Sequence, residues 1–238
     1  PADPPALHAA RLELMRQLGH VLAAPLDAAL QACIPGWSEP WPAGQGDRRL
    51  TAMIWSWRVA AHDPAAIAAA HAAVTSASMT LARAGLRALQ PWPLPARHAA
   101  LDAFHDRWQE RPVILDAWFA LEAGAPFADG LERVERLLAH PRFDPMAPNS
   151  VRAVLGGLAG NAPVFHAADG SGYRFLAARI AELDQRNPIT ASRLVKVFSR
   201  WRSYGRERAG QMAEALRQLR SAPLSTNSRE LVEQCLAD

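Results

Sequence analysis

The sequence contains eight histidines, and a catalytic zinc site would require some of them at a defined spacing. Zinc peptidases commonly hold the metal with two imidazoles one helical turn apart. A glutamate beside the first imidazole activates water, which gives the pattern His-Glu-x-x-His. No histidine here is followed by glutamate, and the closest pairs are nine and seven residues apart. The histidines are His8, His20, His62, His71, His98, His105, His140 and His166. We therefore predict no catalytic residue and no metal ligand in this chain.

Other catalytic patterns are also missing. There is no Gly-x-Ser-x-Gly turn for a nucleophilic serine and no Gly-x-x-x-x-Gly-Lys loop for a phosphate. The segment Asp169-Gly170-Ser171-Gly172 could present backbone N–H groups to an anion at a helix N-terminus. We favour the simpler interpretation, a helix cap followed by glycines that allow a turn. His166 precedes this turn, and without a second ligand nearby we interpret it as a hydrogen-bonded structural histidine.

Short helices separated by recognisable turns are predicted between Asn149 and Arg202, and they would position Asp169 to Gly172 and His166. Asn149 or Ser150 can start one helix, which Gly160-Asn161 can end. A second helix follows the glycine turn, with its buried face at Tyr173, Leu176, Ala177, Ile180 and Leu183. Asn187-Pro188 is typical of an N-cap followed by proline at the first helical position. We therefore predict a further helix that carries Arg193.

Helical patterns extend over the rest of the chain, and we find no period-2 alternation that would indicate a strand. The first helix opens at Pro4-Pro5, and its expected buried stripe is Leu7, Leu14, Met15, Leu18 and Leu22. Short connections between successive helices favour antiparallel neighbours. The predicted fold is all-α, a superhelical stack of antiparallel helix pairs of the HEAT or armadillo type. We predict one domain over residues 1–238, with any sub-break in the Pro/Gly/Trp loop 35–46.

Composition and charge limit the classes of protein to consider. Half of the 238 residues are hydrophobic, which is typical of a folded chain. The net charge of +3 argues against nucleic-acid binding. Cys33 and Cys235 form no Cys-x-x-Cys pair, and no apolar run approaches the length of a membrane span. We expect a cytoplasmic protein without a membrane partner. Because the sequence begins without methionine, we expect it to be a piece of a longer protein.

Many residues in the second half agree in order and spacing with one known family. They include Pro148-Asn149 with Arg152, Phe165-His166-Ala167, Asp169 to Tyr173, Asn187-Pro188, Ala191-Ser192-Arg193, and Arg200-Trp201-Arg202 with Tyr204; upstream, Trp108 and Asp116 to Leu121 also fit. On these residues the chain resembles the C-terminal domain of the bacterial aminopeptidase N family of zinc metallo-aminopeptidases. The resemblance spans roughly Gly46 to the C-terminus and implies an α-helical superhelix that forms the last domain of a four-domain enzyme.

The resemblance also implies roles for individual residues. Arg193 matches a family arginine that projects toward the active-site chamber, where it could contact the carboxylate end of a substrate. Ile189, four residues earlier on the same helical face, stands where the family often has glutamine. The alternative for Arg193 is a surface or structural salt bridge, and the sequence favours neither. Asn149 and Arg152 are weaker candidates, for which we favour capping by Asn149 and a solvated or ion-paired Arg152. His166 is a further weak candidate.

The family's zinc motif and its Gly-x-Met-Glu-Asn segment are both absent from this sequence. We therefore predict a non-catalytic domain that holds no cofactor itself, while the implied parent enzyme binds zinc. Its predicted function is to cap the active-site cleft and to admit only small or unfolded peptides. Its expected partners are the catalytic and N-terminal domains of the parent and a peptide substrate. The alternative is a free-standing helical-repeat scaffold that binds a protein or peptide.

Overall fold

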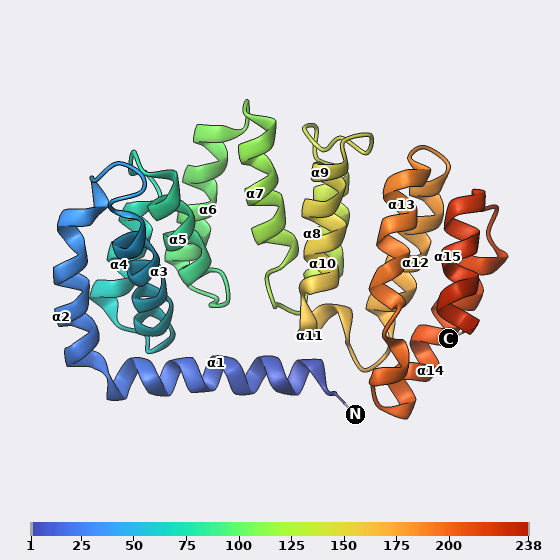
Figure 1. Cartoon of the computed structure of the whole chain (residues 1–238), viewed down its shortest axis with the longest axis horizontal. Coiled ribbons are helices and arrows are strands. Elements are labelled where there is room, and N and C mark those ends of the chain that lie inside the picture. Colours follow the sequence, from blue (N-terminus) through green and yellow to red (C-terminus); the bar gives the residue numbers. More distant parts are fainter. Residues whose placement is uncertain (1, 238) are drawn as a thin grey trace. The chain divides into compact units, whose positions relative to one another are not determined.

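The computed structural model describes residues 2–237, which are mostly helical (Figure 1). They divide into two compact units, one of residues 9–110 and one of residues 2–8 together with 111–237. No β-strand occurs within the described residues, where extended pairing is limited to an isolated bridge between Ala2 and Tyr204. The all-α prediction is confirmed. The prediction of one domain over residues 1–238 stays a prediction.

In the unit of residues 9–110, helices α4 and α5 begin at residues whose side chains cap them. Asp63 caps one helix by accepting a hydrogen bond from the N–H of Ala66 at 2.7 Å, and Pro64 follows it. Ser78 caps the next helix in the same way. The elements of this unit that follow α1 are α2 (Ala23–Cys33), the 3₁₀ turn η1 (Ile34–Trp37), α3 (Gln45–Ala60), α4 (Pro64–Ala73), α5 (Met79–Leu89) and α6 (Pro95–Trp108).

The Pro/Gly/Trp loop over residues 35–46 lies inside this unit and is tied to helix α3. The buried Arg48 side chain donates hydrogen bonds to the carbonyl oxygens of Gly36, at 3.0 Å, and Glu39, at 2.8 Å. The indole of Trp37 donates to Thr51, whereas Trp41 is 76% exposed. These bonds satisfy carbonyl groups that the irregular loop cannot pair with itself.

The unit of residues 2–8 and 111–237 contains most of the positions that the sequence singled out. Its elements are α7 (Pro112–Ala123), α8 (Gly130–Leu138), α9 (Pro148–Val151), the π-helical turn η2 (Arg152–Gly156), α10 (Gly157–Gly160), α11 (Ala162–Phe165), α12 (Ser171–Asp184), α13 (Pro188–Val195), the 3₁₀ turns η3 (Lys196–Phe198) and η4 (Trp201–Ser203), α14 (Arg206–Ser221) and α15 (Thr226–Ala237). Helix α12 packs against α13 and α14, and α13 also packs against α15 (Figure 1).

The core of this unit centres on α12 and on the aromatic side chains around it. All five residues predicted for the buried face of α12 are buried, with Tyr173, Leu176 and Ile180 at 0% exposure. The continuous helical segment 148–160 contains a π-helical turn, which the sequence did not predict. Gly157 allows this segment to approach α7 closely, because a side chain there would contact Ala123.

Helix α1 (Pro4–Val21) forms where the sequence predicted it, but its apolar stripe is not buried. Leu7 and Leu14 are 63% and 59% exposed, so the expectation of a buried stripe was wrong at these positions. Periodicity identifies an apolar face but does not show what covers it. Within residues 2–237 no single helix is long and apolar enough to cross a membrane. Only the bent pair of α1 with the segment Ala23–Trp37 meets the length and composition criteria.

Candidate functional site

The candidate site is built on α13, whose start is fixed by Asn187. The Asn187 side-chain oxygen accepts a hydrogen bond from the N–H of Thr190 at 3.2 Å, which caps the helix as predicted. Its amide nitrogen donates to the carbonyl oxygens of Pro145 and Met146, at 3.3 and 3.2 Å. One side chain therefore holds the first turn of α13 against the loop that leads into α9.

The outer face of α13 carries Ile189 and Arg193, one helical turn apart. Both are exposed, and Ile189 is 62% exposed. The opposite face of the helix is buried against its neighbours through Ala191, Leu194 and Val195. No residue among 2–237 forms a hydrogen bond or ion pair with the Arg193 side chain. The salt bridge considered from the sequence is thus not present within the described chain, and the guanidinium is available to a group from outside it.

Asn149 and Arg152 form a second exposed pair, at the start of α9. The Arg152 guanidinium donates to the Asn149 side-chain oxygen at 2.6 Å. Helix α9 has Ala147 at its N-cap without a side-chain bond, so the expected capping role of Asn149 is wrong. Proline at position 148 already occupies the first helical position, which places Asn149 inside the helix. Burial raises the pKa of Asp116 on α7, and the positive charge of Arg152 acts in the opposite direction.

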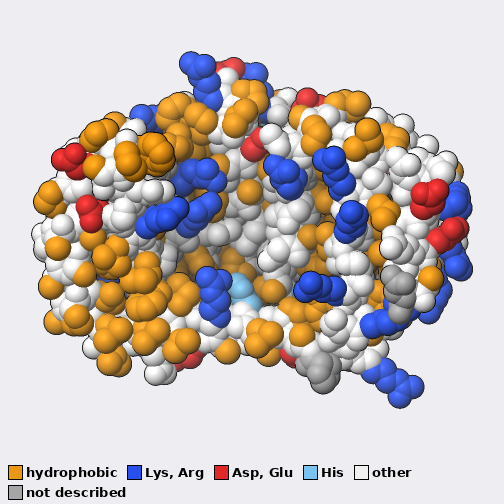
Figure 2. Space-filling view, viewed as in Figure 1, with side chains coloured by type: hydrophobic (Ala, Val, Ile, Leu, Met, Phe, Trp, Pro, Cys, Tyr) orange, Lys and Arg blue, Asp and Glu red, His pale blue; other side chains and the backbone are white. Residues whose placement is uncertain are grey.

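Basic side chains are frequent on the surface over α9 and α13. Figure 2 shows several Lys and Arg side chains over the region that contains α9 and α13 in Figure 1, with few acidic side chains between them. Arg193 and Arg152 are not linked to each other by any hydrogen bond, and their guanidinium groups would both attract an anionic group. The Asn187 bridge to Pro145 and Met146 is what ties the first turn of α13 to the loop before α9.

His166 lies in the core rather than on this surface. It is 6% exposed, and its Nδ1 is 2.7 Å from the hydroxyl oxygen of Tyr173. The Arg208 guanidinium donates to the His166 carbonyl oxygen, and the ring of Tyr204 is 4.8 Å from the imidazole. Burial, with a smaller effect from Arg208, lowers the pKa of His166 to about 4. A neutral imidazole held in this way has a structural role and cannot line an open chamber.

Within residues 2–237, no group of three or more His, Cys, Asp or Glu side chains could hold a metal ion. The zinc that the family resemblance implies therefore has no matching ligand set here.

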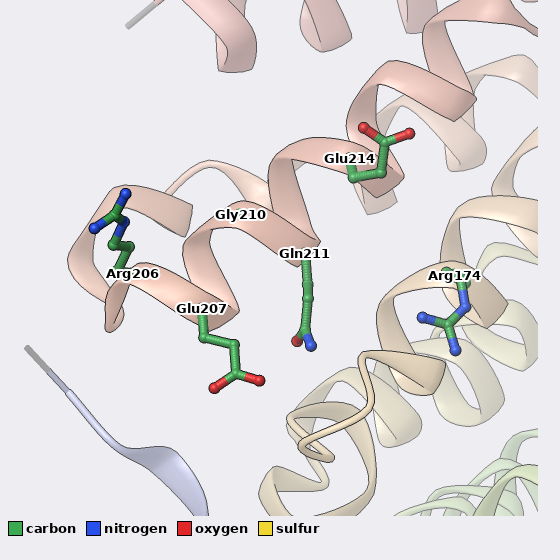
Figure 3. Close-up of a pocket in the computed structure, with 6 residues that line it drawn as sticks. All are labelled: Arg174, Arg206, Glu207, Gly210, Gln211 and Glu214. Carbon is green, nitrogen blue, oxygen red and sulfur yellow. The ribbon is translucent and has the colours of Figure 1, made fainter.

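A groove that the sequence did not predict lies between α14 and the start of α12 (Figure 3). Its volume is about 620 Å³, and it is wide open to solvent. Gln211 and Glu207 point from α14 toward the start of α12, and Arg174 comes from α12 itself. The groove contains two arginines, Arg174 and Arg206, and two glutamates, Glu207 and Glu214. Because these charges balance, the groove favours neither an anion nor a cation.

Comparison with known proteins relates these features to a family. Residues 1–237 match the family described as a domain of unknown function (DUF3458_C) with ARM repeats. The chain belongs to this family. The match confirms the prediction of a helical-repeat fold of the armadillo type.

Relatives of this DUF3458_C domain include aminopeptidases from several bacteria. Aminopeptidase N of Escherichia coli strain K12 is 40% identical over 67% of this chain and 19% of the relative. Aminopeptidase N of Caulobacter vibrioides is 42% identical over 59% of the chain and 16% of the relative. The crystal structure of Legionella pneumophila aminopeptidase A in complex with aspartic acid is also similar. It is 25% identical, with a TM-score of 0.88 over 97% of this chain and 28% of that protein.

These matches confirm the resemblance to the C-terminal domain of aminopeptidase N. They also show that the DUF3458_C domain matches less than a third of the length of these relatives.

Proposed function

We propose that this DUF3458_C domain is the non-catalytic C-terminal part of a zinc aminopeptidase, which removes N-terminal residues from peptides. In this proposal the domain caps the active-site cleft and restricts entry to small or unfolded peptides. The catalytic and N-terminal domains of the parent are its partners. The zinc ligands and the water-activating glutamate belong to the catalytic domain.

One observation supports a role of the α13 face in substrate binding. Arg193 is exposed and has no hydrogen-bond or ion-pair partner among residues 2–237, on a helix whose opposite side is buried and whose first turn is capped by Asn187. A guanidinium held in this way can bind a carboxylate through two parallel hydrogen bonds. We infer that Arg193 lines the substrate chamber and binds the carboxylate end of a short peptide, with Ile189 beside it as an apolar contact.

The test is made in the full-length parent enzyme with Arg193→Ala. A hydrogen bond to a charged group contributes about 1.5–3 kcal/mol, so KM for short peptides with a free C-terminal carboxylate should rise at least 10-fold. The same peptides with an amidated C-terminus should change little. Arg220→Ala, an exposed arginine on α14, is the matched control. Equal effects on acid and amide peptides would contradict the proposed contact.

The non-catalytic role has a separate test. The 238-residue chain should not release amino acids from aminoacyl substrates, with or without added zinc. Zinc-dependent release by the purified chain would refute the assignment of catalysis to another domain. The capping role predicts that the full-length enzyme trims a peptide as a free chain but not when the same sequence is the N-terminus of a folded protein.

A further inference from the structure

A second hollow in the unit of residues 111–237 combines an apolar floor with cationic groups at its edge. Its volume is about 560 Å³, within the range of small-molecule sites. The apolar lining consists of Leu138, Phe143, Pro145, Val151, Leu155 and Leu183. Val151, Leu155 and Leu183 are buried core residues, so the floor of the hollow belongs to the rigid interior of the unit.

The π-helical turn η2 contributes to this hollow. Leu155, which is 2% exposed, lies in the π-helical turn, and Val151 lies one turn before it. Single π-helical turns within helices occur frequently at functional sites. The close approach of Gly157 to α7, which accompanies this turn, also fixes the position of the segment that carries Leu155.

The polar edge of the hollow contains donors that the chain leaves unused. Arg179 pairs with Glu182 at 3.1 Å through one terminal nitrogen, but its Nε is buried and has no hydrogen-bond acceptor. No residue among 2–237 pairs with the exposed guanidinium of Arg186, which also lines the hollow. The Arg179 side chain is 33% exposed, so the outer part of its guanidinium, like that of Arg186, can bind a ligand carboxylate at the edge of the hollow.

The balance of charge selects the ligand. Arg179 and Arg186 against Glu182 leave one net positive charge at the edge. A single carboxylate neutralises this charge and accepts hydrogen bonds from guanidinium groups in good geometry. An ammonium group would be repelled, and an uncharged ligand would lack the attraction to the net positive edge. From this complementarity we propose that the hollow binds a small apolar monocarboxylate, with its hydrocarbon part on the Leu155 floor and its carboxylate at Arg179 and Arg186.

This site is independent of the proposed role of Arg193 and uses different residues. The probe is 4-phenylbutanoate, titrated into the 238-residue chain by isothermal calorimetry and by methyl NMR of Val151 and Leu155. The acid should bind and shift these methyl signals. The matched amide, 4-phenylbutanamide, should bind at least 10-fold more weakly, because it carries no charge.

Two charge variants give opposite expected effects. Arg186→Gln should weaken binding of the acid at least 10-fold. Glu182→Gln should strengthen it several-fold, because it releases Arg179 and raises the net positive charge. Arg220→Gln on α14 is the control for net charge and should leave affinity unchanged.

Three outcomes would overturn the proposal. They are absence of binding at millimolar acid, equal affinity for acid and amide, or equal weakening by Arg186→Gln and Arg220→Gln. Glu182, Arg186 and Arg220 are not buried, so their variants should fold. If the thermal unfolding of a variant matches that of the parent chain, a weaker affinity reports on the site itself.

Discussion

The buried histidine predicts a measurable dependence of stability on pH. Burial lowers the pKa of His166 to about 4 in the folded chain, whereas an unfolded histidine titrates near 6.5. At pH 7 the imidazole is neutral in the folded chain and mostly neutral in the unfolded chain. Below pH 6.5 the unfolded chain takes up a proton that the folded chain does not, so acidification favours unfolding. The stabilisation is thus complete above pH 6.5 and is lost as the pH falls toward 4.

The expected magnitude follows from the linkage relation. Each pH unit between the two pKa values changes the free energy of unfolding by about 1.4 kcal/mol. Between pH 7 and pH 5 the contribution of His166 is therefore a loss of about 2 kcal/mol. The environment supports this size, because the imidazole is 6% exposed and faces the hydroxyl of Tyr173, itself buried. Arg208 adds a positive charge nearby, which also opposes protonation.

The assay is amide hydrogen exchange of α12 at pH 7 and pH 5, corrected for intrinsic exchange rates. Exchange of α12 amides reports the opening of its own unit, so the other unit does not obscure the result. His166→Asn should remove about 2 kcal/mol of the pH-dependent loss, whatever it does to stability at pH 7. His98→Asn, an exposed histidine on α6, is the control and should leave the pH dependence unchanged. If His166→Asn loses as much stability on acidification as the parent chain, the assigned pKa shift is wrong.

Two further predictions concern stability and are measured by urea unfolding. Asp184→Asn should destabilise the chain by about 1–3 kcal/mol, because the buried carboxylate accepts hydrogen bonds from the backbone N–H and the hydroxyl of Ser225; an unchanged midpoint would contradict this. Gly172→Ala should cost about 1–3 kcal/mol, because its methyl group would collide with the carbonyl oxygen of Phe165. Gly210→Ala is the matched opposite case, since it adds a methyl group in open space on α14 and should stabilise by about 0.5–1 kcal/mol. Equal effects of the two alanines would show that backbone entropy, and not contact, decides both.

Local patterns allowed much of the fold to be predicted from the sequence. The buried face of α12 follows from a spacing of three and four residues, and every position predicted for it is buried. The starts of α4 and α13 follow from Asp63-Pro64 and Asn187-Pro188, because a cap needs only residues within one turn. Such signals depend on a few consecutive residues, so they do not change with the residues that pack around them.

Predictions failed where distant residues compete with the local pattern. At the start of α15, Ser225 takes the capping position, and Asp184, 41 residues earlier, holds Ser225. No short pattern shows such a partner. The hollow lined by Leu155 and Arg186 combines four segments of the chain, so it exists only in the folded unit.

Asn187 in the candidate site has a second contact with distant residues that its local pattern did not predict. Asn187 was predicted as a cap from its neighbour Pro188, but its amide nitrogen also binds the loop carbonyls of Pro145 and Met146. That second contact ties the first turn of α13, the helix that carries Arg193, to the segment entering α9. A guanidinium on such a support loses less entropy on binding than one on a mobile loop. Such a support would suit the contact proposed above between Arg193 and the carboxylate end of a peptide.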